Sequence, residues 1–301
     1  MPRATTLQKK PIPKKAITRK PIVKTIPRTQ MPSVWELTKK CISVLWPERW
    51  LFLGIIGTFG LVDLVLAKGF TIGASSSSQL ISGSVPKLGV GLITYAQMLA
   101  TIGNGSSGGG FGFSLVLTIF ASLAIIWSLR NSSNKVKVGL RDAYYRGMYP
   151  LIPFVIILSI IGLELLPLIG GLTVYITAMN SSIALDSIEK LVFLVLLFVL
   201  AVITMFWLSS SVFALYISTL PDMTPIKALR SAKVLVKKRR LAVILRILFL
   251  PFVLLLVSLA IMLPIIIFVP VMASWVFFVL SLLMLLVFHS YMYNFYRELI
   301  A

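Results

Sequence analysis

The sequence predicts an all-α, polytopic integral membrane protein with six transmembrane helices. Of its 301 residues, 58% are hydrophobic and only 13% are charged, whereas a water-soluble domain carries roughly a quarter charged residues. Several apolar stretches reach about 20 residues, the length that crosses a hydrocarbon layer about 30 Å thick. These stretches are continuous rather than alternating, which favours membrane-spanning helices over a β-barrel.

Residues 1–32 form a basic, proline-rich segment ahead of the first apolar stretch. They contain nine Lys or Arg residues and no acid. Proline at this density prevents helix formation, and the apolar content is too low for a core. We therefore expect a disordered cytoplasmic tail that tethers the chain electrostatically. The alternative role of this tail is docking to a protein partner, a ribosome or nucleic acid. The rest of the chain, residues 33–301, is predicted to be the six-helix transmembrane domain.

An amphipathic helix is predicted to begin at Ser33. Ser33 and Glu36 have the spacing of a capping box, in which each side chain satisfies a free amide at the helix start. On a helical wheel, Glu36, Lys39, Lys40 and Ser43 lie opposite an apolar arc. That arc consists of Val34, Leu37, Cys41, Val44 and Leu45, with Trp35, Ile42 and Trp46 at its edges. We expect the helix to lie at the membrane interface with its tryptophans at headgroup level.

Six apolar segments are predicted to span the membrane. Their ranges are approximately 50–68, 113–129, 151–177, 191–219, 241–263 and 272–294. The Gly- and Ser-rich segment 69–112 is predicted as an outer loop with one short surface helix. Pro167, Gly170 and Gly171 are expected to bend or break the third span. The fourth span must tilt or project beyond the bilayer, because it would be about 43 Å long at about 1.5 Å per residue.

Two further basic amphipathic helices are predicted, each ahead of a pair of spans. The first lies within 130–149 and places Arg141 and Arg146 opposite an apolar face. The second starts after Thr224, a natural N-cap residue that is followed by proline at the first helical position. It ends in four consecutive cations, Lys237 to Arg240, directly before the fifth span.

The positive charges fall almost entirely on one side of the predicted topology. Twenty-six of the 29 Lys and Arg residues lie on that side, in 1–49, 130–149, 221–246 and at Arg297. The other three are Lys68, Lys87 and Lys190. The positive-inside rule then makes both termini cytoplasmic. A net charge of +20 could suggest nucleic-acid binding, but charge gathered beside apolar segments is typical of contact with anionic lipid instead.

The three basic helices each begin a unit of one plan, in which a basic amphipathic helix precedes two spans. Their polarity patterns align without gaps from residues 34, 136 and 225, and such repeats often describe how a membrane fold is built. We expect the helices to form a cationic collar that holds anionic phospholipid, each cation contributing on the order of 1 kcal/mol. The expected contacts are Lys39, Lys40, Arg141, Arg146, Lys227, Arg230, Lys233, Lys237, Lys238, Arg239 and Arg240.

The C-terminal third resembles a known group of membrane proteins. The stretch "PIKALRSAKVLVKKRRLAVILRILFL", the two spans and the terminal "YMYNFYREL" look like six-helix bacterial proteins related to the membrane domain of glycerophosphoryl diester phosphodiesterases. Members often show an Ala-Leu…Ser…Val pattern, which here is Ala228, Leu229, Ser231 and Val234. The resemblance is best over 220–300, and without a catalytic domain it implies no phosphodiesterase activity. We expect the chain in the cytoplasmic (inner) membrane of a bacterium.

Asp63 and Glu164 are the only acids inside the predicted spans. Each lies thirteen residues beyond the start of its span, which places both about 20 Å from the inner edge. An ionisable group at that depth is costly to bury and points to function. The functional interpretation is that the two form a protonatable or cation-binding pair facing the bundle interior. The alternatives are that they reach outer headgroup water or are neutral, hydrogen-bonded structural groups.

No catalytic, cofactor-binding or metal-binding site is predicted. The single Cys41 rules out an internal disulfide, and the single His289 rules out a site with several histidines. A Gly-x-Ser-x-Gly match at 105–109 lies in the outer loop rather than at a strand-to-helix turn. His289 is expected to be structural or interfacial. An aromatic belt is expected at Tyr291, Tyr293 and Tyr296.

The leading functional expectation is a non-enzymatic membrane protein that interacts with lipid or organises partners through its basic helices. Two alternatives stay open. One is a small-molecule or ion transporter that uses Asp63 and Glu164. The other is an accessory subunit of a larger membrane complex, engaged through residues 1–32.

Overall fold

The computed structural model describes residues 33–66, 87–100, 110–134, 136–180, 186–221, 223–237 and 239–300. Contacts divide the chain into two units, Met1–Met31 and Pro32–Ala301, and every helix described below belongs to the second. The predictions for the tail, for most of the outer loop and for Lys238 concern residues outside the described ranges.

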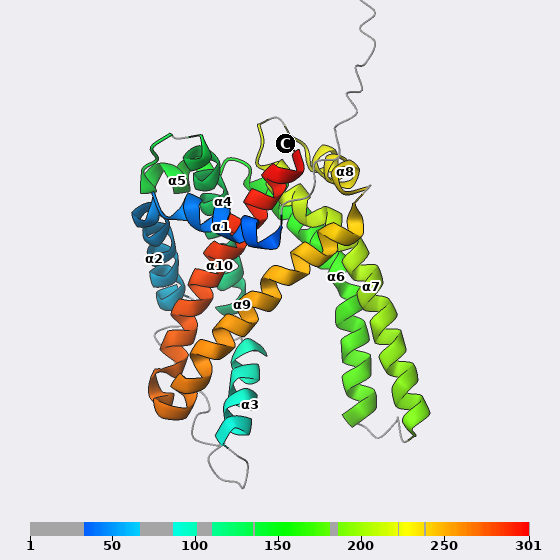
Figure 1. Cartoon of the computed structure of the whole chain (residues 1–301). Coiled ribbons are helices and arrows are strands. Elements are labelled where there is room, and N and C mark those ends of the chain that lie inside the picture. The colour runs from blue at the N-terminus through cyan, green and yellow to red at the C-terminus, as the bar shows by residue number, and fades with distance from the viewer. Residues whose placement is uncertain are drawn as a thin grey trace, which may run out of the picture. The chain divides into compact units, whose positions relative to one another are not determined.

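Ten α-helices and no strand occur within the described ranges (Figure 1). Six of them are long and apolar enough to cross a membrane, which confirms the predicted number. These six are α2 (Arg49–Leu66), α4 (Gly110–Ser133), α6 (Leu151–Asn180), α7 (Ser187–Ser218), α9 (Arg240–Phe268) and α10 (Pro270–Ile300). The other four are α1 (Val34–Leu45), α3 (Lys87–Ala100), α5 (Leu140–Gly147) and α8 (Pro225–Val236).

Proline does not interrupt the long helices. α6 continues through Pro167 to Asn180, so the expected break is not found there. α9 continues through Pro264, and only Val269 separates it from α10. Membrane helices tolerate proline because neighbouring groups satisfy the carbonyl that proline leaves free. Gly171 serves close packing instead, since a Cβ atom there would lie 2.7 Å from a terminal methyl of Leu200 on α7.

α3 packs along α9 rather than lying on the surface as an isolated loop helix. Tyr95 is buried, and its hydroxyl group bonds to Ser258 and to the carbonyl oxygen of Leu255, both near the middle of α9. Gly91 approaches Leu263, closer to the end of α9. The earlier residue of α3 thus contacts the later part of α9, which means that α3 runs antiparallel to α9. The expectation of one short surface helix within 69–112 missed this contact.

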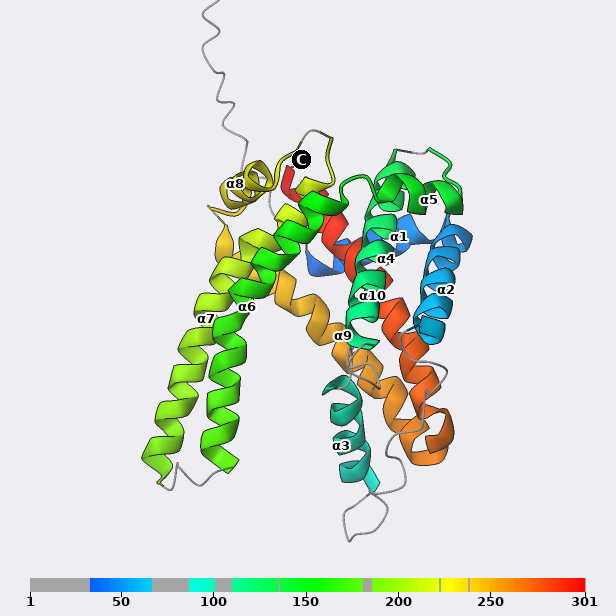
Figure 2. The same cartoon turned by 180° about the vertical axis from the view of Figure 1, so that it is seen from behind.

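The helices α1, α5 and α8 and the C-terminal end of α10 gather at one end of the second unit, which we call the basic end (Figures 1 and 2). The core is concentrated there. All eight residues from His289 to Tyr296 of α10 are buried, as is nearly every residue from Ala121 to Leu129 of α4. They meet the last turns of α7, where Phe213, Tyr216 and Ile217 are also buried.

α7 has two parts with different surroundings. In its most apolar 18-residue window only 6% of the residues are buried, whereas most residues from Ser209 to Ser218 are buried. A helix of 32 residues is about 48 Å long, well beyond a hydrocarbon layer of about 30 Å. The excess length of α7 therefore belongs to the core at the basic end.

Candidate functional site

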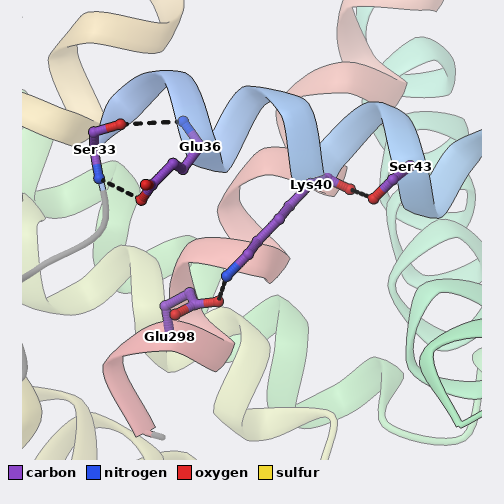
Figure 3. Close-up of polar contacts among 5 residues, drawn as sticks. All are labelled: Ser33, Glu36, Lys40, Ser43 and Glu298. Atoms are coloured by element: carbon purple, nitrogen blue, oxygen red, sulfur yellow. Dashed lines mark hydrogen bonds and ion pairs between the residues drawn. The ribbon is translucent and has the colours of Figure 1, made fainter.

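The start of α1 has the local structure that its sequence predicts. The Ser33 hydroxyl accepts a hydrogen bond from the Glu36 amide at 3.3 Å, and the Glu36 carboxylate accepts one from the Ser33 amide at 3.1 Å (Figure 3). Lys40 reaches from α1 to Glu298 and forms an ion pair near the C-terminal end of α10 (Figure 3). Because Glu298 already neutralises the Lys40 ammonium group, Lys40 attracts an external anion less strongly than an unpaired lysine would.

The middle of the predicted apolar arc of α1 packs against protein. Leu37 and Cys41 are fully or almost fully buried against the core. The exposed apolar side consists of the residues at the edges of the arc, Trp35, Ile42 and Trp46, whose exposed fractions are 81%, 58% and 66%. Burial also raises the pKa of the Cys41 thiol, which keeps it protonated and unreactive at neutral pH.

α5 is held to the bundle by its buried face. Gly147 lies so close to α4 that an added Cβ atom would sit 3.2 Å from the Cα atom of Ala124. The Tyr144 hydroxyl donates to the carbonyl oxygen of Ile55 on α2 at 2.8 Å, and partial burial raises its pKa. The two predicted lipid contacts, Arg141 and Arg146, are exposed.

α8 presents the densest exposed charge among the described residues. Its helix begins as predicted, with Thr224 as N-cap and Pro225 in the first turn. Ala228, Ala232 and Val236 form its buried face, and α8 packs against α7 and α6. The cations on its exposed side are Lys227, Arg230, Lys233 and Lys237. Ile226 and Val234, both more than two-thirds exposed, lie among them.

The exposed surface of α8 carries no acidic side chain that could neutralise its cations. Residues 223–237 contain no Asp or Glu. Within the described part of the chain, the ion pairs are Lys40 with Glu298 and Arg146 with Asp142, at 3.9 Å in the second case. The four cations of α8 therefore face outward without a carboxylate partner among the described residues.

Arg240 lies where α8 ends and α9 begins. Its guanidinium carbon is 4.0 Å from the ring centroid of Phe206 on α7, which is a cation–π contact. Arg239 precedes it as the N-cap residue of α9 and is half-buried. Lys238, also a predicted lipid contact, is not among the described residues.

The two intramembrane acids occupy separate environments. Asp63 on α2 is 3% exposed, and its Oδ1 atom has no hydrogen-bond partner. Glu164 on α6 accepts a hydrogen bond from Ser211 of α7 at 2.6 Å through Oε1, while its buried Oε2 has no partner. α2 packs against α4, α5 and α10, whereas α6 packs against α7 and α8. The acids thus lie on helices with different neighbours.

A buried polar network links three helices at the basic end. His289 bonds through Nε2 to the Ser122 hydroxyl at 2.9 Å and through Nδ1 to the Tyr216 hydroxyl at 3.2 Å. Arg130 donates to the carbonyl oxygen and the hydroxyl of Thr219, the C-cap residue of α7, at 2.7 and 2.8 Å. A cation at that position satisfies the end of a helix and complements its dipole.

This network shows what the sequence-based interpretation missed. His289 is structural, as expected, but Tyr291, Tyr293 and Tyr296 are buried and do not form an aromatic belt that faces the headgroups. Their burial follows from the elements packed around α10, which are α1, α2, α4, α7 and α9. The sequence signal was the mixture of polar and aromatic residues in "HSYMYNFY", which suits a crowded core as well as an interface.

The arrangement offers ionic and hydrogen-bonding contacts rather than a set of metal ligands. No group of three or more His, Cys, Asp or Glu side chains suited to a metal ion occurs among the residues that the structure describes. A comparison of the chain with models of protein families, with curated proteins and with solved structures gives no significant match.

Proposed function

We propose that this protein binds anionic phospholipids through the basic helices α1, α5 and α8 and acts as a non-enzymatic, lipid-interacting component of its membrane. One observation carries the proposal. The buried face of α8 is already occupied by protein contacts, and the exposed side of the helix presents four cations without an acid. The apolar residues Ile226 and Val234 lie between those cations, a composition that suits a headgroup layer above acyl chains.

The three helices do not contribute equally. Each cation near an anionic leaflet is worth about 1 kcal/mol. Lys40 and Arg146 are engaged by Glu298 and Asp142, so we assign them the smaller share. We assign the larger share to Lys39 and the α8 cations. Trp35 and Trp46 complement them on α1, because exposed tryptophan favours the membrane interface.

The proposal includes a location and an orientation. We place the protein in the cytoplasmic membrane of a bacterium, with the basic end and both termini in the cytoplasm. The support is the segregation of Lys and Arg, of which only Lys68, Lys87 and Lys190 lie outside the basic segments. The three-unit repeat and the relationship to the phosphodiesterase membrane-domain group are parts of the same proposal. The alignment of the three basic helices supports the repeat, and the resemblance over 220–300 supports the relationship.

Native mass spectrometry tests the lipid proposal directly. The full chain is extracted gently from bilayers of phosphatidylglycerol and phosphatidylcholine, beside a variant with Lys227→Gln, Arg230→Gln and Lys233→Gln. We expect the wild type to retain phosphatidylglycerol preferentially and the triple variant to lose most of that preference. Lys190→Gln, at the opposite end of α7, is the control and should retain it. Equal retention by the wild type and the triple variant would contradict the proposal.

A second candidate function is ion or small-molecule transport. The observation that favours it is that each of the two acids inside the predicted spans has one buried carboxyl oxygen without a partner, Asp63 Oδ1 and Glu164 Oε2. Unsatisfied polar atoms are costly in hydrocarbon, which makes such acids candidates for protons or cations. Because the acids lie on helices with different neighbours, we propose two separate positions rather than one shared site. Proton-driven flux in liposomes is the measurement that distinguishes this candidate.

A protein partner for residues 1–32 is a further part of the proposal. Nine cations and no acid in that segment suit an acidic surface, on another protein or on the membrane. Copurification of the full chain beside a variant without residues 2–32 would distinguish a protein partner from binding to the membrane surface. A protein that accompanies only the full chain supports the accessory-subunit interpretation, and its absence from both preparations would remove it.

A further inference from the structure

The junction of α8 and α9 combines a fixed cation with an apolar surface that begins beside it. Arg240 is the first residue of α9, and its guanidinium group lies over Phe206 of α7. Phe206 is itself 47% exposed, so this contact lies at the surface of the helix pair. The stacking therefore holds a cation at a defined position where α7 and α9 meet.

Stacking uses the face of the guanidinium group and leaves its edges free. The N–H donors of arginine lie in the plane of the group, and their fork matches the two oxygens of a phosphate. Among the described residues, the two ion pairs of the chain do not involve Arg240. Its in-plane donors are thus not occupied by a carboxylate of this part of the chain.

An apolar stripe follows on α9. Leu241 is 80% exposed and Leu245, one turn further, is 69% exposed. The same face continues through Leu248 to Phe252, both of them exposed. Residues spaced by three or four positions share one side of a helix, so these four residues make a continuous apolar track, whose first residue, Leu241, directly follows Arg240 in the chain.

We propose that this junction is a seat for one anionic phospholipid, whose phosphate binds Arg240 and whose acyl chain lies along the α9 stripe. We favour a lipid over free phosphate as the occupant, because only a ligand with an acyl chain can cover the track of exposed leucine and phenylalanine residues. The seat deepens the proposed lipid-binding function and rests on it for the nature of the ligand. It differs from the α8 surface because it fixes one lipid instead of attracting many.

The test counts the last lipids that stay bound. The full chain is extracted from bilayers containing phosphatidylglycerol, and native mass spectrometry follows lipid loss with increasing activation. Arg240→Gln should reduce the last retained phosphatidylglycerol by about tenfold, because a charged hydrogen bond is lost. Phe206→Leu keeps an apolar side chain but removes the stacking, and should reduce retention by about threefold. Phe198→Leu makes the same exchange at an exposed position of α7 that is outside the seat, and it should leave retention within error of the wild type.

Two further variants keep the result interpretable. Arg240→Lys preserves the charge and removes the planar fork, so it should fall between the wild type and Arg240→Gln. The triple substitution at Lys227, Arg230 and Lys233 should lower total lipid enrichment but leave the last lipid in place. If that triple variant behaves as wild type while Arg240→Gln loses its lipid, the proposed function fails and the seat stands.

Three outcomes would overturn the seat. The first is unchanged retention in Arg240→Gln. The second is an equal loss in Phe198→Leu and Phe206→Leu, which would indicate general lipid contact. The third is displacement of the lipid by millimolar inorganic phosphate, which would identify a phosphate site without a chain.

Discussion

Polar and basic residues at the basic end fall into two groups, those with partners inside the protein and those that are exposed. Arg130 and His289 form hydrogen bonds inside the protein, the first with the C-terminal end of α7 and the second with Ser122 and Tyr216. Lys233 and Lys237, by contrast, project from α8 without a carboxylate on that helix. Burial and partners, not residue type, therefore decide which cations can meet an external anion.

The acids Asp63 and Glu164 give the prediction at this scale. In proteoliposomes with a proton gradient, we expect Asp63→Asn to reduce any flux by at least about tenfold, because an amide cannot exchange a proton at this position. Glu164→Gln retains an oxygen that can accept the hydrogen bond from Ser211, so its fold should persist while its own contribution to flux is lost. Because distant sites act independently, the losses should multiply in the double variant.

Asp142→Asn is the matched control, since Asp142 is an exposed acid on α5. Flux that is the same in the wild type, in both single variants and in the control would remove the transport candidate.

At the level of elements, the amphipathic helices are used in an unexpected way. The amphipathic helices α1 and α8 were predicted from apolar residues that were expected to avoid water at the membrane interface, but Leu37 and Ala232 are buried in protein contacts. A helical wheel identifies which residues avoid water, and both lipid and a protein core satisfy that demand. The three-sided surface of α1, with a buried side, a tryptophan side and a charged side, follows only from its neighbours.

α3 supplies the prediction at this scale. Tyr95 is buried against α9 and bonds to Leu255 and Ser258, so Tyr95→Ala should lower the free energy of unfolding by about 3 kcal/mol. Leu92→Ala, at a half-exposed position of the same helix, should cost much less. Reversible unfolding in mixed micelles of increasing denaturing detergent measures both. Equal effects of the two substitutions would show that α3 does not dock on α9.

In the whole second unit, packing density is unevenly distributed. The core lies where α4, α7 and α10 meet at the basic end, and it contains polar groups such as Ser209, Ser218 and Asn294. The outer part of α7 exposes Val195, Phe198 and other apolar residues. Such a division suits a chain whose one end meets water and headgroups and whose other parts meet hydrocarbon.

The orientation of the whole molecule gives the last prediction. In a Cys41→Ala background, a cysteine is placed at Ser43 on α1 or at Lys190 on α7. With the basic end in the cytoplasm, a membrane-impermeant maleimide added to intact spheroplasts should label position 190. Position 43 should react only after the membrane is permeabilised. The reverse pattern would contradict the proposed topology, and labelling of both after permeabilisation is the control for reactivity.

The sequence by itself determined the class of protein and the places where its helices begin. Six apolar segments, the Ser33–Glu36 capping box and the Thr224–Pro225 start are local features, and each was found as predicted. They were predictable because hydropathy and capping depend on residues close together in the chain.

Only the tertiary structure decided which side of each helix faces protein. It buried Tyr291 and Tyr296 in a core, docked α3 on α9 and placed Asp63 and Glu164 on helices with different neighbours. It also brought Arg240 over Phe206, 34 positions earlier in the chain. These features depend on contacts between distant segments, and apolar surface looks the same in a sequence whether it will meet lipid or another helix.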